Sequence, residues 1–406
     1  MTNAYYDFDF VPIATNSTLP GDGRIILQSA RMRLEMRAST DLSQNSATNY
    51  GGAIVGVWES TDGGTTWSPN MINNYDHGRQ LPMSLYSGPN HYNPPGYEVG
   101  GPGYMAGQPD TAVAYNPLEQ GDWAGFPSRI LAYGNDGTTY YVKTQMRSFG
   151  VTNYETGTVC ESWTRFVADN VARRWYRITV DRAADAAATS ENTARYPGFN
   201  QEFPIAYVND TYRYFSFHNG TDIVTRNLNN ANEYLQGVSM GQNWMAISEG
   251  SGSGHGFGIH GPDIWTQDAR IDGDPNSPGG ETGFTSTYMA NSVGRMIDPV
   301  GTLYSVVDII VGTPSDVQSW ALSNTASRPN GNIPNYNLAV SRSNFYTQNA
   351  TTNDEATGGQ LVVTHLNEQA RLKSPAKAFA ASDVPTLYIR MKNDFHFVNG
   401  KSGRRF

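Results

Sequence analysis

The sequence contains a single cysteine, Cys160, so the chain can form no disulfide within itself. Only 16% of the residues are charged, no lysine occurs before Lys143, and the formal net charge is −9. Proteins that bind nucleic acids usually carry a basic stripe, so we expect no nucleic-acid partner. No apolar run approaches the length of a membrane-spanning helix, and the N-terminal residues have neither a basic region nor an apolar core. We therefore expect a protein made in the cytoplasm without a signal peptide and without membrane insertion.

Turn-forming and strand-forming residues make up much of what is present. The chain has 42 glycines and 24 tyrosines, and asparagine and threonine are also common. This composition suits many short strands joined by turns. It predicts an all-β protein.

One segment, Ser60 to Trp67, reads S-T-D-G-G-T-T-W. The Asp62 carboxylate can accept hydrogen bonds from backbone N–H groups of a turn, and Gly63 and Gly64 can adopt positive φ. The preceding residues, 53–58, are apolar and rich in β-formers, so they predict a strand that leads into the turn. The segment resembles the Asp box of sialidase-like, BNR-repeat β-propellers. The matching positions are Ser60, Asp62, Gly64, Thr66 and Trp67.

The resemblance implies a β-propeller fold but not sialidase activity. Sialidases also carry an Arg-Ile-Pro segment, and the nearest sequence here is Arg24-Ile25-Ile26. Further strand-turn-strand patterns occur at 130–142, 203–218, 293–310 and 386–398. We predict a single β-propeller over residues 1–406, with about six or seven blades and long loop insertions. The segments 7–11 and 394–398 are similar, which suggests that the N- and C-terminal strands close one blade.

The candidate ligand-binding residues lie in Gly- and Pro-rich stretches that we expect to be long loops. Histidine and aromatic residues gather there, and histidine can act as a base or as a hydrogen-bonding partner of a sugar. The candidates are His91, Tyr92, His255, His260, Asp263 and Trp265. No metal-ligand spacing and no nucleotide fingerprint fits the sequence, so we expect neither a metal nor a cofactor.

A second segment is similar to propeller polysaccharide lyases. It comprises Thr193 to Phe199 and Tyr212 to Gly220. In such lyases a histidine or tyrosine removes the proton next to a uronate carboxylate, and an arginine neutralises that carboxylate. The resemblance implies His218, Tyr196 and Arg195 as the catalytic candidates.

The single cysteine, the few lysines and the turn-rich β composition make the chain similar to structural proteins of tailed bacteriophages, several of which contain propellers. This similarity implies a structural or host-attachment component of a virion, of the tail, nozzle, fibre or receptor-binding type. Its partners are expected to be other virion proteins, copies of itself and a host surface glycan. Two alternatives stay open. One is a glycan-processing enzyme of the propeller polysaccharide lyase or glycosidase type, and the other is a non-catalytic carbohydrate-binding module.

Overall fold

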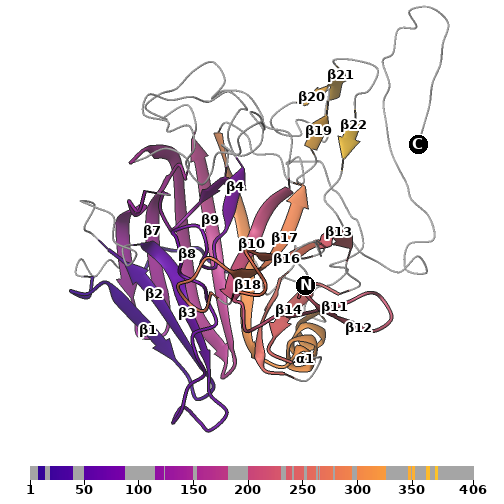
Figure 1. Ribbon diagram of the computed structural model, residues 1–406. Coiled ribbons are helices and arrows are strands. Elements are labelled where there is room, and N and C mark those ends of the chain that lie inside the picture. Colours follow the sequence, from indigo (N-terminus) through magenta and orange to yellow (C-terminus); the bar gives the residue numbers. More distant parts are fainter. Residues whose placement is uncertain are drawn as a thin grey trace, which may run out of the picture.

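In its described residues, the computed structural model has β-strands as its regular secondary structure except for one helix (Figure 1). It describes residues 8–13, 19–39, 50–86, 115–122, 124–149, 153–181, 200–229, 235–239, 242–250, 254–261, 264, 266–277, 279–294 and 300–325. It also describes four short strands that form two antiparallel pairs, β19 (Tyr346–Gln348) with β22 (Arg371–Lys373) and β20 (Ala350–Thr352) with β21 (Val363–His365).

The largest sheet is antiparallel and has nine strands in the order β12-β11-β14-β15-β18-β9-β8-β7-β6. Its strands are β6 (Arg129–Asn135), β7 (Tyr140–Arg147), β8 (Glu155–Ala168), β9 (Val171–Asp181), β11 (Tyr214–His218), β12 (Ile223–Asn227), β14 (Trp244–Ser248), β15 (Gly256–His260) and β18 (Val300–Gly312). The long pair β9 and β18 lies near its middle. Since β12 and β6 are the end strands, the sheet is open.

A six-stranded sheet has the order β13-β16-β17-β10-β4-β5, and a three-stranded sheet has the order β1-β2-β3. The strands are β1 (Arg24–Gln28), β2 (Met32–Ala38), β3 (Gly51–Glu59), β4 (Ser84–Tyr86), β5 (Tyr115–Pro117), β10 (Asn200–Asn209), β13 (Leu235–Ser239), β16 (Thr266–Asp272) and β17 (Ser286–Gly294). The chain after β3 joins the two sheets, because Met71 N donates to Val57 O at 3.0 Å and Asn73 N donates to Tyr207 O at 2.9 Å.

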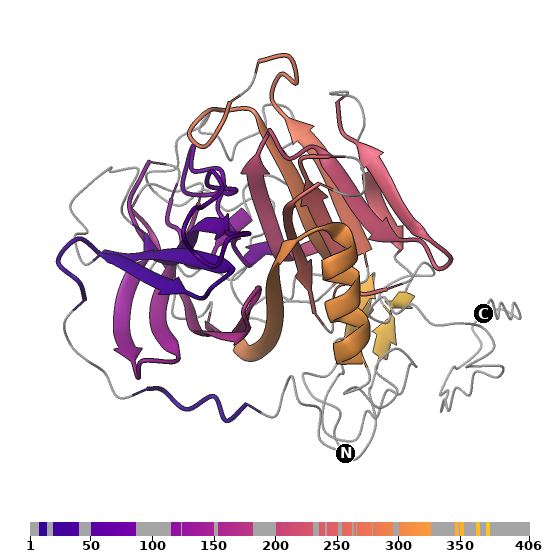
Figure 2. The same cartoon turned by 90° about the horizontal axis from the view of Figure 1, so that it is seen from below.

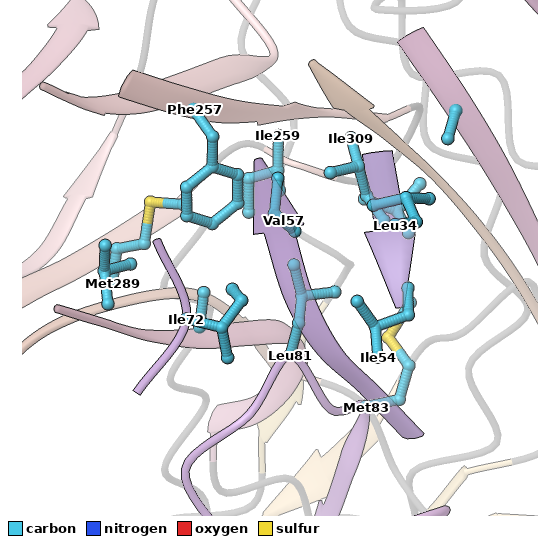
Figure 3. Close-up of a cluster of buried hydrophobic side chains, with 14 of the residues drawn as sticks. Leu34, Ile54, Val57, Ile72, Leu81, Met83, Phe257, Ile259, Met289 and Ile309 are labelled. Atoms are coloured by element: carbon cyan, nitrogen blue, oxygen red, sulfur yellow. The ribbon is translucent and has the colours of Figure 1, made fainter. Parts of the chain in front are cut away.

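The hydrophobic core lies between the nine-stranded sheet and the other two. Figure 3 shows Leu34, Ile54 and Val57 of the three-stranded sheet close to Ile259 and Ile309 of the nine-stranded sheet. The same core includes Ile72, Leu81, Met83, Phe257 and Met289. The fold is therefore a sandwich, which buries one face of each sheet and leaves the other face for different contacts.

Strand β9 shows the alternation that such a sandwich requires. Ala172, Tyr176 and Ile178 belong to the core between the sheets. Trp175 belongs to a separate aromatic cluster on the opposite, outer face of the nine-stranded sheet. Alternate side chains of β9 therefore lie in two different environments, the core between the sheets and the aromatic cluster on the outer face.

Helix α1 (Pro314–Thr325) covers part of that outer face (Figure 2). Thr313 is its N-cap: its Oγ1 accepts a hydrogen bond from Asp316 N at 3.2 Å, and Asp316 Oδ2 accepts one from Thr313 N at 2.8 Å. Val317 and Ala321 pack with Trp244, Ala246 and Ile310. The apolar end of the outer face is thus buried under the helix.

The predicted β-propeller is wrong, because the described strands form open sheets of a sandwich and no closed ring of blades. Two of the expected hairpins are crossovers: β10 and β11 lie in different sheets, and so do β17 and β18. The Gly-rich stretch 250–283, which includes His255 and His260 and is predicted to be a long loop, contains β15 and all of β16. The all-β class and the hairpin of β6 and β7 are confirmed.

The proposed closure by terminal strands has no counterpart in the described residues. Phe8 to Val11 form no strand and pack on the outer face of the nine-stranded sheet. Residues 394–398 lie outside the described part of the chain.

Candidate functional site

The outer face of the six-stranded sheet brings together tyrosines, arginines and carboxylates. We call it the tyrosine–arginine face, and its residues are Tyr75, Asp76, Arg79, Glu202, Tyr207, Asp268, Arg270, Asp272, Phe284 and Tyr288. The strand register aligns Tyr207 of β10, Tyr288 of β17 and Arg270 of β16 in one row across three strands. Their chain neighbours Ala206, Met289 and Ala269 point into the core. The alternation of the strands therefore directs this row outward.

A tyrosine and a glutamate form a direct pair in this face. The Tyr288 hydroxyl donates a short hydrogen bond to Glu202 Oε1, and the two residues are only 2% and 7% exposed. Glu202 precedes an irregularity in β10, which shifts its register against β17 between Glu202 and Ile205. Irregularities of this kind often occur beside functional sites. The pair is largely shielded from solvent.

Two arginines stack on the tyrosines of the face. The Arg270 guanidinium carbon lies 4.2 Å from the centre of the Tyr288 ring, and Arg270 Nε donates to Asp272 Oδ1 at 2.7 Å. Arg79 lies 5.2 Å from the Tyr207 ring and donates to Ser286 Oγ at 2.8 Å. These contacts hold both guanidinium groups against the tyrosine rings.

Two exposed aromatic rings border Arg79. Tyr75 is 47% and Phe284 is 55% exposed, and their ring centres are 5.5 Å apart in an edge-to-face arrangement. The Arg79 guanidinium carbon lies 5.1 Å from the Tyr75 ring and 4.6 Å from the Phe284 ring. An exposed aromatic pair beside fixed hydrogen-bonding groups offers both a stacking surface and directional polar contacts.

The electrostatics of the face are dominated by acids. It holds two arginines and four carboxylates, a formal net charge of −2. Burial raises the pKa of Asp76, although Arg79 partly offsets this effect. Burial would lower the pKa of Arg270, but the hydrogen bond and charge of Asp272 raise it above its usual value. Burial, followed by the charge of Asp272, raises the pKa of Tyr207. Tyr207 is therefore a neutral hydrogen-bond donor. The net negative charge of the face does not favour a polyanion.

His255 and His260, the two predicted ligand histidines within the described residues, do not come together. His260 is fully buried on the outer face of the nine-stranded sheet, where its Nδ1 lies 3.0 Å from Asp308 Oδ2. His255 lies at the other end of β15, with its Nδ1 2.9 Å from Glu59 Oε2. Both histidines have carboxylate partners within the fold, so the geometry gives them structural contacts and no shared site.

Of the three lyase candidates, the described residues include His218 alone. His218 ends β11, and its Nδ1 accepts a hydrogen bond from Gly220 N at 3.1 Å within a tight turn. Tyr196 and Arg195 lie outside the described residues, as do His91, Tyr92, Asp263 and Trp265. Their predicted roles stay predictions.

The segment Ser60 to Trp67 forms the expected turn, although it belongs to no propeller blade. Asp62 Oδ1 accepts hydrogen bonds from Thr65 N at 3.1 Å and Thr66 N at 2.9 Å, and Asp62 Oδ2 accepts one from Thr66 Oγ1 at 2.6 Å. Gly63 and Gly64 have φ of 75° and 89°. The chain then runs back along β3, where Ser68 N donates to Glu59 O. The segment therefore determines local structure and does not identify a family.

These hydrogen bonds, with that of Thr66 Oγ1 first among them, lower the pKa of Asp62 to about 2. An unfolded aspartate titrates near about 3.9, so the contribution of Asp62 to stability is fully present above that pH. It is lost as the pH falls through about 2. We expect the unfolding midpoints of the wild type and Asp62→Ala to differ at pH 6 and to converge in this acid window. Denaturant titrations at several pH values measure this, and a difference that does not change with pH would contradict it.

Sequence reasoning missed the tyrosine–arginine face. The alternation Arg270-Ile271-Asp272 does indicate a strand with two charged residues on one face. The pairing of that strand with β17, and of β17 with β10, has no equally local signal.

The described residues contain no group of three or more histidine, cysteine, aspartate or glutamate side chains that could hold a metal ion. No helix in the described part of the chain is long and apolar enough to cross a membrane.

No known protein family model matches the chain, and no curated protein matches it. Similar solved structures include a "putative aldose 1-epimerase" of Escherichia coli K12, with 12% identity and a TM-score of 0.38 over 72% of this chain and 100% of the other. A 4-alpha-glucanotransferase of Thermococcus litoralis has 10% identity and a TM-score of 0.35, over 72% of this chain and 38% of that enzyme. A heparan sulfate lyase of Pedobacter heparinus has 8% identity and a TM-score of 0.33, over 87% of this chain and 44% of that enzyme.

All three descriptions name proteins that act on carbohydrates, and none of the three names a virion component. The predicted Asp-box, BNR-repeat propeller is therefore corrected, because the described strands form open sheets, and the predicted virion role has no support in these three descriptions. At these low TM-scores the likeness transfers no activity, so function is argued from the geometry alone.

Proposed function

We propose that the protein binds and processes a glycan on the tyrosine–arginine face. The observation that carries the proposal is the continuous series of contacts from the exposed Tyr75 and Phe284, through Arg79 and Tyr207, to the buried pair of Tyr288 and Glu202. Such a series combines a stacking surface with a titratable pair at its inner end. These are the components that a small polar site in a carbohydrate-processing protein requires.

The charge of the face favours a neutral sugar. Sugar hydroxyl groups can donate to the carboxylates of Asp76 and Asp272, whose side chains are 26% and 23% exposed. They can also accept hydrogen bonds from Arg270, whose side chain is 33% exposed. An acidic sugar would be repelled by the net negative charge of the face.

The pair of Tyr288 and Glu202 can move a proton. A sugar hydroxyl gives its proton to the Tyr288 oxygen while the Tyr288 proton passes to Glu202. The sugar oxygen keeps the electron pair of the broken O–H bond, Glu202 becomes a carboxylic acid and Tyr288 is unchanged. Arg270, stacked on the Tyr288 ring, stabilises negative charge on the tyrosine oxygen during the transfer.

The experiment is a screen of neutral oligosaccharides against the full chain, with anomeric NMR signals and new reducing ends as the readouts. On a substrate found in this way, Glu202→Gln and Tyr288→Phe are each expected to lower the turnover rate by about 10²-fold, because each removes one half of the proton relay. Tyr214→Phe changes a tyrosine of the nine-stranded sheet and is the control. Equal thermal stability of the three variants ensures that a rate loss is not a folding defect.

The same substrate tests the binding half of the proposal. Phe284→Ala is expected to weaken binding by about fivefold to tenfold, because it removes one ring of the exposed pair. Leu322→Ala, at a side chain that is 53% exposed on α1, is the matched control. Binding that is insensitive to Phe284→Ala contradicts the proposed face. Binding that depends on Phe284 without any turnover contradicts the proton relay and leaves a carbohydrate-binding protein.

A further inference from the structure

A second surface, on the outer face of the nine-stranded sheet, alternates rows of charge with a row of aromatic rings. The register places Tyr141, Trp163, Trp175 and Val306 side by side across β7, β8, β9 and β18. On one side of this aromatic row lie Lys143, Glu161, Arg177 and Tyr304. On the other side lie Arg165, Arg173, Asp308 and His260. Rows two residues apart on a strand are separated by about 7 Å, so cations border the rings on both sides.

This surface is basic although the protein is acidic. Its three rows hold three arginines and one lysine against two carboxylates, a formal net charge of +2 on a chain of net charge −9. Arg165 is exposed and, among the described residues, forms no ion pair. Its guanidinium carbon lies 4.9 Å from the Trp175 ring, and that of Arg177 lies 5.6 Å from the Trp163 ring. The arginines are thus held beside the rings that they border.

A segment of the chain itself covers the aromatic row. The Phe8 ring stacks on Trp175 with centres 4.4 Å apart and planes 13° from parallel. The Phe10 ring meets Trp163 edge-on at 5.5 Å and Tyr304 at 5.0 Å. Trp163 Nε1 donates to Val11 O at 3.0 Å. Within the described residues, this hydrogen bond from a side chain to a backbone carbonyl accompanies the ring contacts, and Asp9, Val11 and Pro12 are exposed.

We propose that the aromatic and cationic rows form a binding site for an acidic glycan, and that residues 8–13 cover it until the glycan displaces them. A sugar ring stacks on Trp175 in the place of the Phe8 ring, and its carboxylate or sulfate groups meet Arg165 and Arg177 on either side. The parallel stacking of Phe8 shows that Trp175 presents a flat face to a ring. This site is independent of the tyrosine–arginine face, whose negative charge favours a different class of sugar.

The proposal is tested by calorimetric titration of the full chain with an oligogalacturonate at low salt, with a neutral dextran oligomer as the control ligand. We expect Phe8→Ala/Phe10→Ala to bind the acidic oligomer about tenfold more tightly than the wild type, because two ring contacts no longer compete with it. Arg165→Ala, added to that variant, is expected to weaken binding about threefold or more. Arg226→Ala, at an exposed arginine of the edge strand β12, is expected to have no effect. Any binding of dextran belongs to the tyrosine–arginine face and is expected to be unchanged in all of these variants.

Several results would overturn the proposal. One is a folded Phe8→Ala/Phe10→Ala variant that binds no more tightly than the wild type, and another is equal weakening by Arg165→Ala and Arg226→Ala. If the double variant does not fold, Arg165→Glu and Arg226→Glu in the otherwise unchanged chain decide the question, because only the first is expected to abolish binding. Phe284→Ala leaves this binding unchanged, which separates it from the proposed function.

Discussion

Replacement of Asp308 by alanine is expected to lower the free energy of unfolding by about 3–5 kcal/mol. Asp308 is fully buried and accepts hydrogen bonds from Arg173 Nε at 2.5 Å, His260 Nδ1 at 3.0 Å and Trp320 Nε1 at 2.8 Å. Its loss breaks the buried ion pair with Arg173, and breaking a buried pair by removing one partner is strongly destabilising. The carboxylate also connects β9, β15, β18 and α1.

Denaturant and thermal unfolding of the variant measure this effect. Asp222→Ala, at an exposed aspartate of the turn between β11 and β12, is the control and is expected to change stability by less than about 0.5 kcal/mol. A loss of less than about 1 kcal/mol in Asp308→Ala would show that water reaches Arg173 and solvates it.

The same carboxylate makes stability depend on pH. Burial alone would raise the pKa of Asp308, but the hydrogen bonds of His260 and Arg173 hold it well below its usual range. Because the folded pKa is depressed, the stabilisation is fully present above the unfolded pKa of about 3.9 and is lost as the pH falls below it. Wild type and Asp308→Ala should therefore differ less in stability below about pH 3 than at pH 7.

Glu119→Ala is the second substitution with a large expected effect, also about 3–5 kcal/mol of destabilisation. Arg174 and Glu119 are 0% and 1% exposed, and Arg174 Nη2 lies 2.5 Å from Glu119 Oε1. Arg174 Nη2 also donates to Gly52 O at 2.9 Å and to Ser162 Oγ at 2.8 Å. Without Glu119, a guanidinium in the core between the sheets has neutral partners only.

The double replacement Arg174→Met/Glu119→Leu is expected to recover most of this loss. Arg174 Nε and Nη1 have no hydrogen-bond partner within the described structure, so the pair does not fully compensate the cost of burying it. Two apolar side chains of similar length avoid that cost. Unfolding titrations of the two single variants and the double variant give the coupling free energy of the pair. A double variant as unstable as Glu119→Ala would contradict this expectation.

Features that depend on nearby residues could be predicted from the sequence. The hairpin of β6 and β7 follows from Asn135-Asp136-Gly137 between two strand-forming runs, and the Asp62 turn follows from eight consecutive residues. Helix α1 also has local signals, since Thr313 and Asp316 form a capping pattern and Pro314 suits the first turn.

Features that depend on which sheet a strand joins could not be predicted. Residues 209–213 look like a hairpin turn, yet they carry the chain from β10 in one sheet to β11 in the other. A short polar connection can join two strands of one sheet or two strands of different sheets. Packing against distant strands decides which sheet each strand joins. The propeller prediction failed for this reason.

The candidate site depends on the same distant pairing. Tyr207, Arg270 and Tyr288 become neighbours only through the register of β10, β16 and β17. A slip of one residue would turn each of these side chains into the core, so the site exists only in the completed sheet. The consecutive Arg173 and Arg174 show the same limit, since each pairs with an acid far away in sequence, on opposite faces of β9.

The pairing of β9 with β18 also constrains how the protein is made. Val171 pairs with Ile310 and Asp181 with Val300, so β9 has no partner on that side until the ribosome has synthesised more than a hundred further residues. During that interval the nascent chain exposes a long strand edge in the middle of its largest sheet. Exposed edges of this kind recruit other chains, and β9 carries three arginines, at 173, 174 and 177, that oppose such pairing by charge repulsion. The arginines that form ion pairs in the folded sheet would therefore also reduce the association of unfinished chains.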